Sequence, residues 1–343
     1  MPSVVLANSI QAQSASAGVT VPEPPEPPVD ESFAILFEDD ALAIVAKSGN
    51  IPCHPGGRYR DHTLAHLLAE RAGFPALHWV NRLDRETSGT VVVAKTAEVA
   101  SRLGRALMRG RFAKRYLAIV QCGGVQTLPQ ADSAAILILR KRGGSGGAGG
   151  SPADHSRCLA GEPPTPRQAP NAKMRIAADS GAWETVRGTL HPARGCGVRK
   201  MRLFVREGEA PPAPDSGAAI VPTGPGQLCE TRFRLLDQRG GFALVEAEPV
   251  TGRVHQIRAT LRAMGLPVVG DKLYGPDPGI YARLCDDAMT EADRASLLLP
   301  RQALHAASIA FPHPFTGALI HVEAPLPPDM KEFWAASSTL RAQ

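Results

Sequence analysis

The sequence predicts an α+β fold with a mixed or antiparallel sheet. Short apolar runs bounded by turn residues, which are typical of strands, occur along most of the chain. Segments with the apolar spacing of a helix are few and scattered among them. The chain has 343 residues, 43% of them hydrophobic, and this is enough for a substantial core in one large domain or two.

The first 31 residues differ from the rest in composition. They are rich in Ser, Ala and Pro, as in VPEPPEPPVD, and lack an apolar period, so we expect a disordered arm. A domain over residues 32–337 and a tail at 338–343 complete the predicted organisation. Segments at about 141–172 and 207–226 are too rich in Gly, Pro and Ser to pack, which predicts two flexible insertions in this domain.

The first expected elements are a hairpin and a helix. FAILFEDDALAIVAKSG has two apolar runs around Asp39 and Asp40, which predicts the hairpin. HTLAHLLAERAG predicts a helix with Leu64, Leu67 and Leu68 on one face. The continuous apolar run TVVVA farther on indicates a buried strand.

TAEVASRLGRALMRG predicts an amphipathic helix with Thr96 as its N-cap. Its apolar stripe consists of Val99, Leu103, Ala106 and Leu107. RYLAIVQ and AAILILR are candidate strands, and ETVRGTL and KMRLFV are weaker candidates between the two insertions.

The last third of the domain begins with the strands ETRFRLLD and GFALVEAEP, separated by the turn signal Gly240-Gly241. GRVHQIRATLRAMG then predicts a helix. Its inward face consists of Val254, Ile257, Leu261 and Met264. A strand pair near residues 307–323 and a short helix end the domain.

Charge is unevenly distributed along the chain. The first basic residue is Lys47, and seven of the 33 acidic residues precede it, so the remainder has 38 basic against 26 acidic side chains. A globular part with this net charge of +12 attracts polyanions, of which nucleic acid is the commonest. A charged solvated surface explains the same count.

A basic strip stands out within this distribution. From Arg82 to Arg115 there are nine basic and three acidic residues, whereas an exposed helix usually mixes the signs. The strip consists of Arg102, Arg105, Arg109, Arg111, Lys114 and Arg115. Contact with RNA or DNA phosphates is the natural use of such a strip, and a solvated face is the alternative.

Metal and membrane functions find no support. The six cysteines are far apart and form no C-x-x-C motif, which suits a reducing cytosol and argues against zinc. His62 and His66 lie four residues apart, but the Glu of a metalloprotease helix and a third ligand are missing, so no metal is expected. Because neither a signal peptide nor an apolar run of about 18 residues occurs, we expect a soluble cytoplasmic protein without a membrane partner.

Nucleotide-cofactor and acyl-transfer motifs are equally weak. GSGGAG formally matches G-x-G-x-x-G, but Pro152 and linker composition follow it where a helix should open, so no nucleotide cofactor is expected. No G-x-S-x-G motif favours acyl transfer.

NRLDRETSG, at Asn81–Gly89, places one carboxylate between two guanidinium groups directly before a strand. A structural ion pair of Asp84 with Arg82 or Arg85 explains the pattern without any function. Loops that enter strands commonly display functional groups, however, and an ionised carboxylate is a ready nucleophile or base. Arg253 in GRVHQIR lies at the start of a predicted helix, where a cation can face an anion. Spacing alone does not bring the two segments together.

Several segments match, in order, the motifs of one known family. They are ILFEDDALAIVAKSGNIPCHPG, NRLDRETSGTVVVAKT, AKRYLAIV, TGRVHQIRATLRAMGLPVVGDKLYG and RQALHA. Together they resemble the RluA-type RNA pseudouridine synthases over roughly Phe33 to Pro325, apart from the insertions. The resemblance implies a mainly antiparallel sheet with peripheral helices and a central catalytic cleft. It also implies a cofactor-independent reaction, in which uridine in RNA exchanges its ribose–nitrogen bond for one to carbon 5.

The resemblance implies roles for single residues. Asp84 would be the catalytic carboxylate, Arg253 would pair with it, and Tyr116 would stack on the target base. Arg82 would fill the gap that the flipped nucleotide leaves, and stacking of about 1–3 kcal/mol per base would offset the cost of flipping. Further RNA contacts are expected from Arg85, Arg102, Arg105, Arg109, Lys114, His255 and Arg258.

Two positions depart from the family pattern. Asn81 stands where many relatives have His, and Thr260 replaces another common His, so fine positioning is affected rather than activity. No separate small RNA-binding domain is apparent before residue 33. The target stays open between large-subunit ribosomal RNA and transfer RNA, and we expect a monomer.

Two other functions remain as alternatives. An RNA-binding protein without catalysis is disfavoured by the intact Asp84, Tyr116 and Arg253. A glycosidase would need two carboxylates, but Asp84 and Glu86 are so close on an extended segment that their side chains point to opposite sides.

Overall fold

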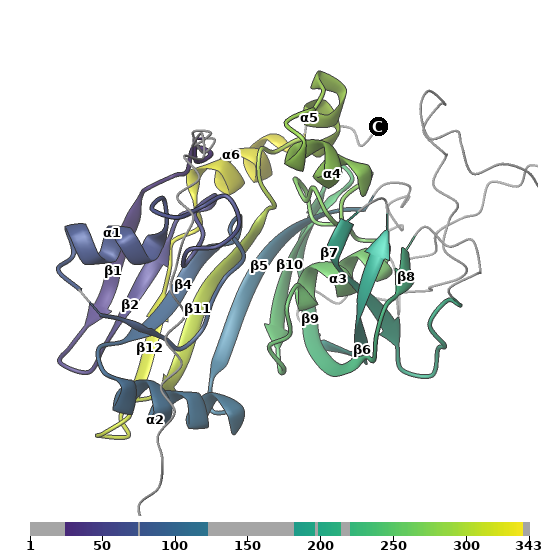
Figure 1. Cartoon of the computed structure of the whole chain (residues 1–343). Coiled ribbons are helices and arrows are strands. Elements are labelled where there is room, and N and C mark those ends of the chain that lie inside the picture. Colours follow the sequence, from purple (N-terminus) through teal and green to yellow (C-terminus); the bar gives the residue numbers. More distant parts are fainter. Residues whose placement is uncertain (1–24, 75, 123–181, 196–197, 214–219, 339–343) are drawn as a thin grey trace, which may run out of the picture.

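The computed structural model describes residues 25–74, 76–122, 182–195, 198–213 and 220–338, and its α+β fold confirms the predicted class (Figure 1). The strands are β1 (Phe33–Glu38), β2 (Leu42–Lys47), β3 (His78–Trp79), β4 (Ser88–Ala94), β5 (Ala113–Gln121), β6 (Glu184–Gly195), β7 (Val198–Arg206), β8 (Ile220–Pro222), β9 (Gln227–Arg239), β10 (Phe242–Pro249), β11 (Leu304–Pro312) and β12 (Leu319–Glu323). The helices are α1 (Leu64–Arg71), α2 (Ala97–Met108), α3 (Gln256–Ala263), α4 (Gly279–Cys285), α5 (Glu291–Leu297) and α6 (Pro328–Ala336).

The strands form one mixed, mainly antiparallel sheet, as predicted. Its order is β1-β2-β4-β11-β5-β10-β9-β6-β7, and β12, β3 and β8 pair with β11, β4 and β6 outside this path. Among the described strands, β4 and β11 form the parallel pair and all other pairs are antiparallel. The order places β5 and β10, which are far apart in the sequence, side by side in the middle of the sheet (Figure 1).

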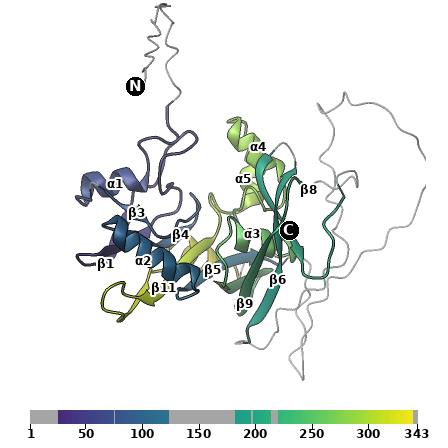
Figure 2. The same ribbon diagram turned by 60° about the horizontal axis from the view of Figure 1, so that its bottom comes forward.

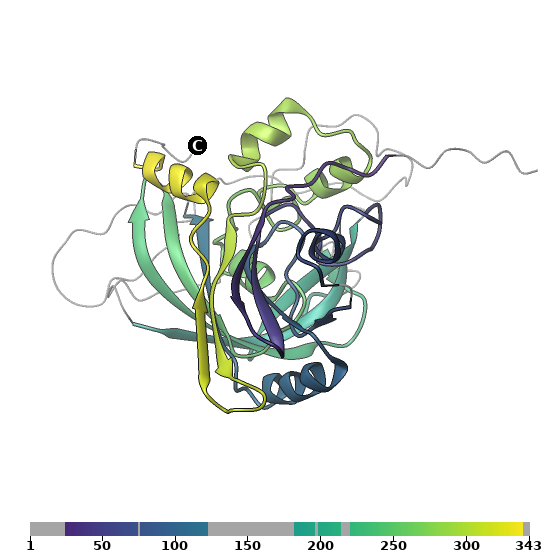
Figure 3. The same cartoon turned by 90° about the vertical axis from the view of Figure 1, so that its left-hand side faces the viewer.

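Helices cover both faces of the sheet around β4. Val91 and Val93 belong to the apolar cluster of α1, whereas Val92 and Ala94 belong to that of α2. All seven residues of β4 are buried as a result, which explains why TVVVA has no polar alternation. Figures 1 and 3 show α2 at one end of the strands and α4, α5 and α6 at the other, and Figure 2 brings the α2 end toward the viewer.

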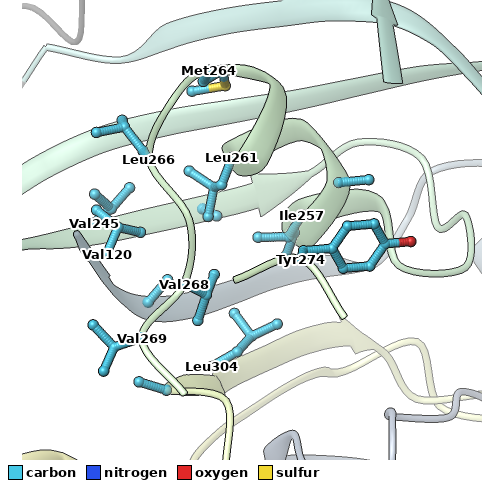
Figure 4. Close-up of a cluster of buried hydrophobic side chains, with 14 of the residues drawn as sticks. Val120, Val245, Ile257, Leu261, Met264, Leu266, Val268, Val269, Tyr274 and Leu304 are labelled. Carbon is cyan, nitrogen blue, oxygen red and sulfur yellow. The ribbon is translucent and has the colours of Figure 1, made fainter. Parts of the chain in front are cut away.

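The largest core lies between α3 and the central strands. Ile257 and Leu261 of α3 pack with Val120 of β5 and Val245 of β10 (Figure 4). The prediction that Val254 points inward is wrong, because α3 begins only at Gln256 and Val254 is 50% exposed.

Local signals placed other element ends correctly. Thr96 is the N-cap of α2, and its hydroxyl accepts a hydrogen bond from Val99 N. Gly240 and Gly241 join β9 to β10 with φ of 54° and 87°, a turn that favours glycine at both positions.

Other segments differ from the expectation. Residues 25–31, assigned to a disordered arm, contact the domain, because the Glu26 carboxylate accepts hydrogen bonds from Asp61 N and His62 N, both at 3.0 Å. Strand β8 lies within the insertion predicted at 207–226 and pairs with β6. AAILILR, GSGGAG and the insertion at 141–172 lie outside the described residues. Within the described chain, every helix is too short or too polar to cross a membrane.

Candidate active site

Asp84 lies in the loop that enters β4, and buried contacts fix this loop to the start of β11. The Thr87 hydroxyl accepts a hydrogen bond of 2.6 Å from Gln302 Nε2. Gly89 has φ of 112°, and a Cβ atom there would lie 2.2 Å from Ala306 O. Only glycine therefore allows β11 to approach β4 directly after the loop.

A buried lysine holds the same loop from the side of β2. Lys47 Nζ donates hydrogen bonds to the carbonyl oxygens of Ser48, Ile51 and Arg85, at 2.8, 2.8 and 2.9 Å. Burial lowers the pKa of Lys47 to about 8. The ammonium group thus ties the end of β2 to the residue that follows Asp84.

The partner of Asp84 is Arg258, from α3. Arg258 Nη1 donates to Asp84 Oδ2 at 2.7 Å, while its Nε and Nη2 form a bidentate pair with Asp271 at 2.7 and 2.8 Å. Asp271 is fully buried and also accepts hydrogen bonds from the backbone N–H groups of Leu273 and Tyr274, both at 2.9 Å. Asp271 therefore orients the guanidinium, and the guanidinium in turn orients Asp84.

This arrangement keeps Asp84 ionised. Burial disfavours the carboxylate, but the charges of His255 and Arg258 and hydrogen bonds from Arg258 and Gln302 outweigh it, so the pKa of Asp84 is lowered. The side chain retains 30% exposure, and Oδ1 is free of the ion pair that binds Oδ2.

His255 lies next to Oδ1 but is not a second cation. Its Nε2 is 3.9 Å from Asp84 Oδ1. Burial lowers the pKa of His255 to about 4, so the imidazole is neutral at pH 7. Arg258 is then the cation that is paired with Asp84 at neutral pH.

Tyr116 is brought to Asp84 by the strand register. It pairs with Ala306 of β11, and Ala306 pairs with Gly89 at the start of β4. Burial, followed by the negative charge of Asp84, raises the pKa of Tyr116. The phenol therefore stays protonated at neutral pH, within electrostatic range of the Asp84 carboxylate.

The predicted pairing of Arg253 with Asp84 is wrong. Arg253 is exposed, precedes α3, and donates from Nε to the carbonyl oxygen of Leu228 at 3.3 Å. Arg258 was expected to contact RNA, but it is only 7% exposed and occupies the place assigned to Arg253. The two arginines of GRVHQIR have exchanged their expected positions, because the helix begins later and turns Arg258 inward.

Arg85 and Glu86 are also engaged in the protein. Arg85 donates to Asn50 Oδ1 at 2.9 Å, to the Tyr59 hydroxyl at 2.6 Å and to Glu86 Oε1 at 2.7 Å, which leaves it poorly placed for RNA. Glu86 also accepts two hydrogen bonds from Lys272 Nζ, at 2.9 and 3.0 Å, and one from Gln302 N at 3.3 Å. Glu86 is thus neutralised by two cations, which removes the second carboxylate that a glycosidase would need.

The basic strip divides into two parts. Arg102, Arg105 and Arg109 are exposed on α2, which follows β4, whereas Asp84 precedes β4. The seven-residue strand β4, about 20 Å long, separates the loop of Asp84 from the start of α2. Lys114 is nearer, since a Cβ on Gly252 would lie 3.5 Å from its Nζ.

Arg82 is the exposed guanidinium of the Asp84 loop. Its Nη1 lies 3.1 Å from His54 Nε2, and Arg85 on the other side of Asp84 is half-buried. Arg82 is therefore available at the rim, where the resemblance places the residue that fills the gap in the RNA.

Sequence reasoning missed Asp271, Tyr274, Lys47 and Lys272. A partial signal existed for Arg258, which lies three residues before the inward Leu261 and so shares its helix face. Asp271 in GDKLYG directly follows an apolar run, where a carboxylate needs a partner.

The site combines an ionised carboxylate, a fixed guanidinium and a protonated phenol. Such a carboxylate can attack an electron-poor carbon or accept a proton, and the phenol offers an aromatic face. No group of three or more His, Cys, Asp or Glu side chains that could hold a metal occurs among the described residues.

Sequence comparisons relate the chain to a known family. The sequence model of a family described as RNA pseudouridylate synthase matches residues 41–263. Ribosomal large subunit pseudouridine synthase D of Xanthomonas campestris is 26% identical over 313 residues, which cover 90% of this chain and 70% of the relative. The D enzyme of Nitrosomonas europaea and the C enzyme of Pasteurella multocida are each 29% identical over 303 residues. These matches cover 86% and 88% of this chain, and 62% and 67% of the relatives.

Solved structures share the fold. Human RNA Pseudouridylate Synthase Domain Containing 4 has a TM-score of 0.52 at 18% identity, over 90% of this chain and 94% of its own. Human RNA Pseudouridylate Synthase Domain Containing 1 has the same TM-score at 20% identity, over 93% and 99%.

Proposed function

Since the chain belongs to the RNA pseudouridylate synthase family, whose members isomerise uridine in RNA to pseudouridine, we propose that it modifies large-subunit ribosomal RNA with Asp84 as the catalytic carboxylate. The curated relatives above are named for the large ribosomal subunit, which supports this substrate over transfer RNA. The observation that carries the catalytic assignment is the ionised Asp84 held at 2.7 Å by Arg258.

The target uridine enters the site by flipping out of the RNA. Neither its glycosidic bond nor its carbon 5 is accessible within a structured RNA, and extrusion costs a few kcal/mol. Tyr116 supplies an aromatic face for the extruded base, and Arg82 at the rim inserts into the gap left behind. Stacking of about 1–3 kcal/mol per base offsets the cost of extrusion.

The reaction breaks the bond between ribose carbon 1′ and base nitrogen 1, and forms a bond between carbon 1′ and carbon 5. Carbon 5 then loses its proton and nitrogen 1 gains one, so the overall change is an isomerisation. We assign Asp84 Oδ1 as the reacting oxygen, because Oδ2 is bound by Arg258. Tyr116 acts as a protonated phenol in this scheme, since its raised pKa disfavours a phenolate.

Cations around the site supply affinity for the phosphates. Arg253 is exposed in the segment before α3, close to the half-buried Lys114, and Arg102, Arg105 and Arg109 are exposed on α2, beyond the other end of β4. Such contacts position the RNA without reading its bases.

The test is chemical mapping of pseudouridine in total RNA from a deletion strain and its parent. We expect one site or a small set of sites to disappear from large-subunit ribosomal RNA, and to return with the wild-type gene. Loss confined to transfer RNA contradicts the substrate, and unchanged pseudouridine throughout contradicts the activity.

A further inference from the structure

The two ring nitrogens of His255 face different groups. Nδ1 lies 3.0 Å from the Tyr274 hydroxyl oxygen, and Nε2 lies 3.9 Å from Asp84 Oδ1. The His255 and Tyr274 rings meet edge to face, with centroids 5.6 Å apart and planes at 80°. His255 thus stands between a buried phenol and the proposed catalytic carboxylate.

The hydrogen bonds of Tyr274 determine which nitrogen carries the proton. Tyr274 is 1% exposed, and its hydroxyl oxygen accepts a hydrogen bond from Arg202 N at 2.8 Å. Burial raises the pKa of Tyr274, so the phenol keeps its single proton. That proton is left for His255 Nδ1, and a neutral imidazole whose Nδ1 accepts carries its own proton on Nε2.

The backbone holds the ring in this place. His255 has φ of 59° and ψ of 17°, a left-handed conformation that is uncommon for residues other than glycine. The Gln256 side chain fixes the turn, because its Oε1 accepts from Arg253 N at 3.0 Å and its Nε2 donates to Glu230 O at 2.9 Å. Strained residues that are held in this way are common at functional sites.

Charges from several elements surround the imidazole. They are Asp84 before β4, Arg258 on α3, Asp271 after α3 and Arg202 on β7. Burial is the largest effect and lowers the pKa of His255 to about 4, Asp84 and Asp271 favour the imidazolium, and the two arginines oppose it. Asp84 is already paired with one cation, the guanidinium of Arg258.

We propose that Tyr274 is a positioning residue: its hydroxyl holds His255 as the neutral Nε2–H tautomer, so that Asp84 Oδ1 faces an N–H donor and not a second cation. This inference rests on the proposed catalytic role of Asp84. An imidazolium at 3.9 Å would form an ion pair with Oδ1 and take the reacting oxygen away from uridine. Tyr274 therefore keeps the two carboxylate oxygens of Asp84 in different states. Oδ2 is paired with Arg258, and Oδ1 stays free to react.

The tautomer is measured directly by nitrogen-15 NMR of the imidazoles in the full-length wild-type protein at pH 7.5. His305 is the internal reference, because its Nε2 faces Ala324 O at 3.1 Å and its Nδ1 faces the Ser88 hydroxyl at 2.9 Å. We expect His255 to match His305, with the proton on Nε2 and Nδ1 bare. A proton on Nδ1, alone or together with Nε2, overturns the proposal, and this reading does not depend on activity.

The consequence is measured in Tyr274→Phe, by its nitrogen-15 spectrum and by single-turnover pseudouridine formation at pH 7.5. The substitution leaves His255 buried, so its pKa stays lowered, but Nδ1 loses the donor that makes it an acceptor. We expect the proton of His255 to distribute over both ring nitrogens and the single-turnover rate to fall by about two- to tenfold, the range that corresponds to the loss of one hydrogen bond. A His255 proton that stays wholly on Nε2 in this variant overturns the proposal.

Ser88→Ala is the matched control, because it removes the hydroxyl beside a buried histidine outside the carboxylate pair. Its single-turnover rate and the tautomer of His255 should match those of wild type, and a change like that of Tyr274→Phe contradicts the assignment to Tyr274. If Tyr274→Phe does not fold, the wild-type tautomer decides alone. If wild type isomerises no uridine, the proposed function fails, but the nitrogen-15 spectrum still gives the tautomer of His255.

Discussion

Asp84 is paired with the arginine that is buried, not with the one that the motif places first. Arg258 reaches Asp84 from inside the protein, where a low dielectric strengthens the ion pair and Asp271 fixes its geometry. Arg253 is solvated, and its charge is screened there. The electrostatics of the site therefore depend on a triad of Asp271, Arg258 and Asp84.

Exchanging each arginine for alanine separates their roles. Arg258→Ala leaves two carboxylates uncompensated, one of them fully buried, so we expect a loss of about 3–5 kcal/mol in the free energy of unfolding and loss of turnover. Arg253→Ala should change stability by less than about 0.5 kcal/mol and raise KM with kcat retained. Urea unfolding and single-turnover kinetics measure both.

A result in which Arg253→Ala abolishes turnover while Arg258→Ala retains it would return the pairing role to Arg253.

The sequence alone could not choose between the two arginines. Both arginines belong to one short motif, and the choice depends on where α3 begins, which is four residues later than the segment GRVHQIRATLRAMG suggests. Val254 was misplaced for the same reason.

At the scale of elements, the loop before β4 is held by contacts from β2, β11 and the segment after α3. Lys47 is the contact from β2, and its burial makes the free energy of unfolding depend on pH. Its pKa is about 8 in the folded protein and about 10.5 in the unfolded chain, so between these values the unfolded chain binds more protons. The Lys47 contribution to stability is therefore lowest below pH 8 and rises as the pH increases to about 10.5.

We expect the difference in unfolding free energy between wild type and Lys47→Met to shift in favour of wild type by on the order of 1–3 kcal/mol from pH 7.5 to pH 10.5. Other groups that titrate in this range cancel in the difference. Denaturant titrations of both proteins at each pH measure it. A constant difference would mean that Lys47 does not titrate in this window.

Helix α2 carries the part of the basic strip that is far from Asp84. The combined Arg105→Ala and Arg109→Ala variant should bind RNA more weakly, with kcat at saturation unchanged and the dependence of log K on log salt reduced by about 2. Arg206→Ala with Arg294→Ala removes the same charge from β7 and α5 and serves as control. Equal weakening in both variants would make the effect one of net charge.

At the scale of the molecule, the sheet unites segments that the sequence keeps apart. Asp84 and Arg258 are 174 residues apart, and Tyr116 joins them through β5 and β11. Hairpins, capped helices and the buried strand TVVVA were predictable because their signals are local. The loop of Asp84 and the approach of Tyr116 to it followed from family motifs.

The remainder was not predictable, because it depends on long-range contacts. Helices α4 and α5 lack a strong apolar period, and α5 begins with a capping box at Thr290 and Asp293 that is easily overlooked. Asp271 and Lys272 acquire partners only when the chain folds over the loop of Asp84. Buried charges of this kind carry no periodic signal.

The most direct test uses the deletion strain complemented with wild type, Asp84→Asn or Asp286→Asn. Asp286 is an exposed aspartate at the end of α4, so its variant controls for the loss of a carboxylate. Asp84→Asn should fold and bind RNA yet leave the target uridine unmodified, with turnover reduced by at least about 10²-fold, whereas Asp286→Asn should restore pseudouridine fully. Restoration of pseudouridine by Asp84→Asn to the wild-type level would contradict the catalytic role of this carboxylate.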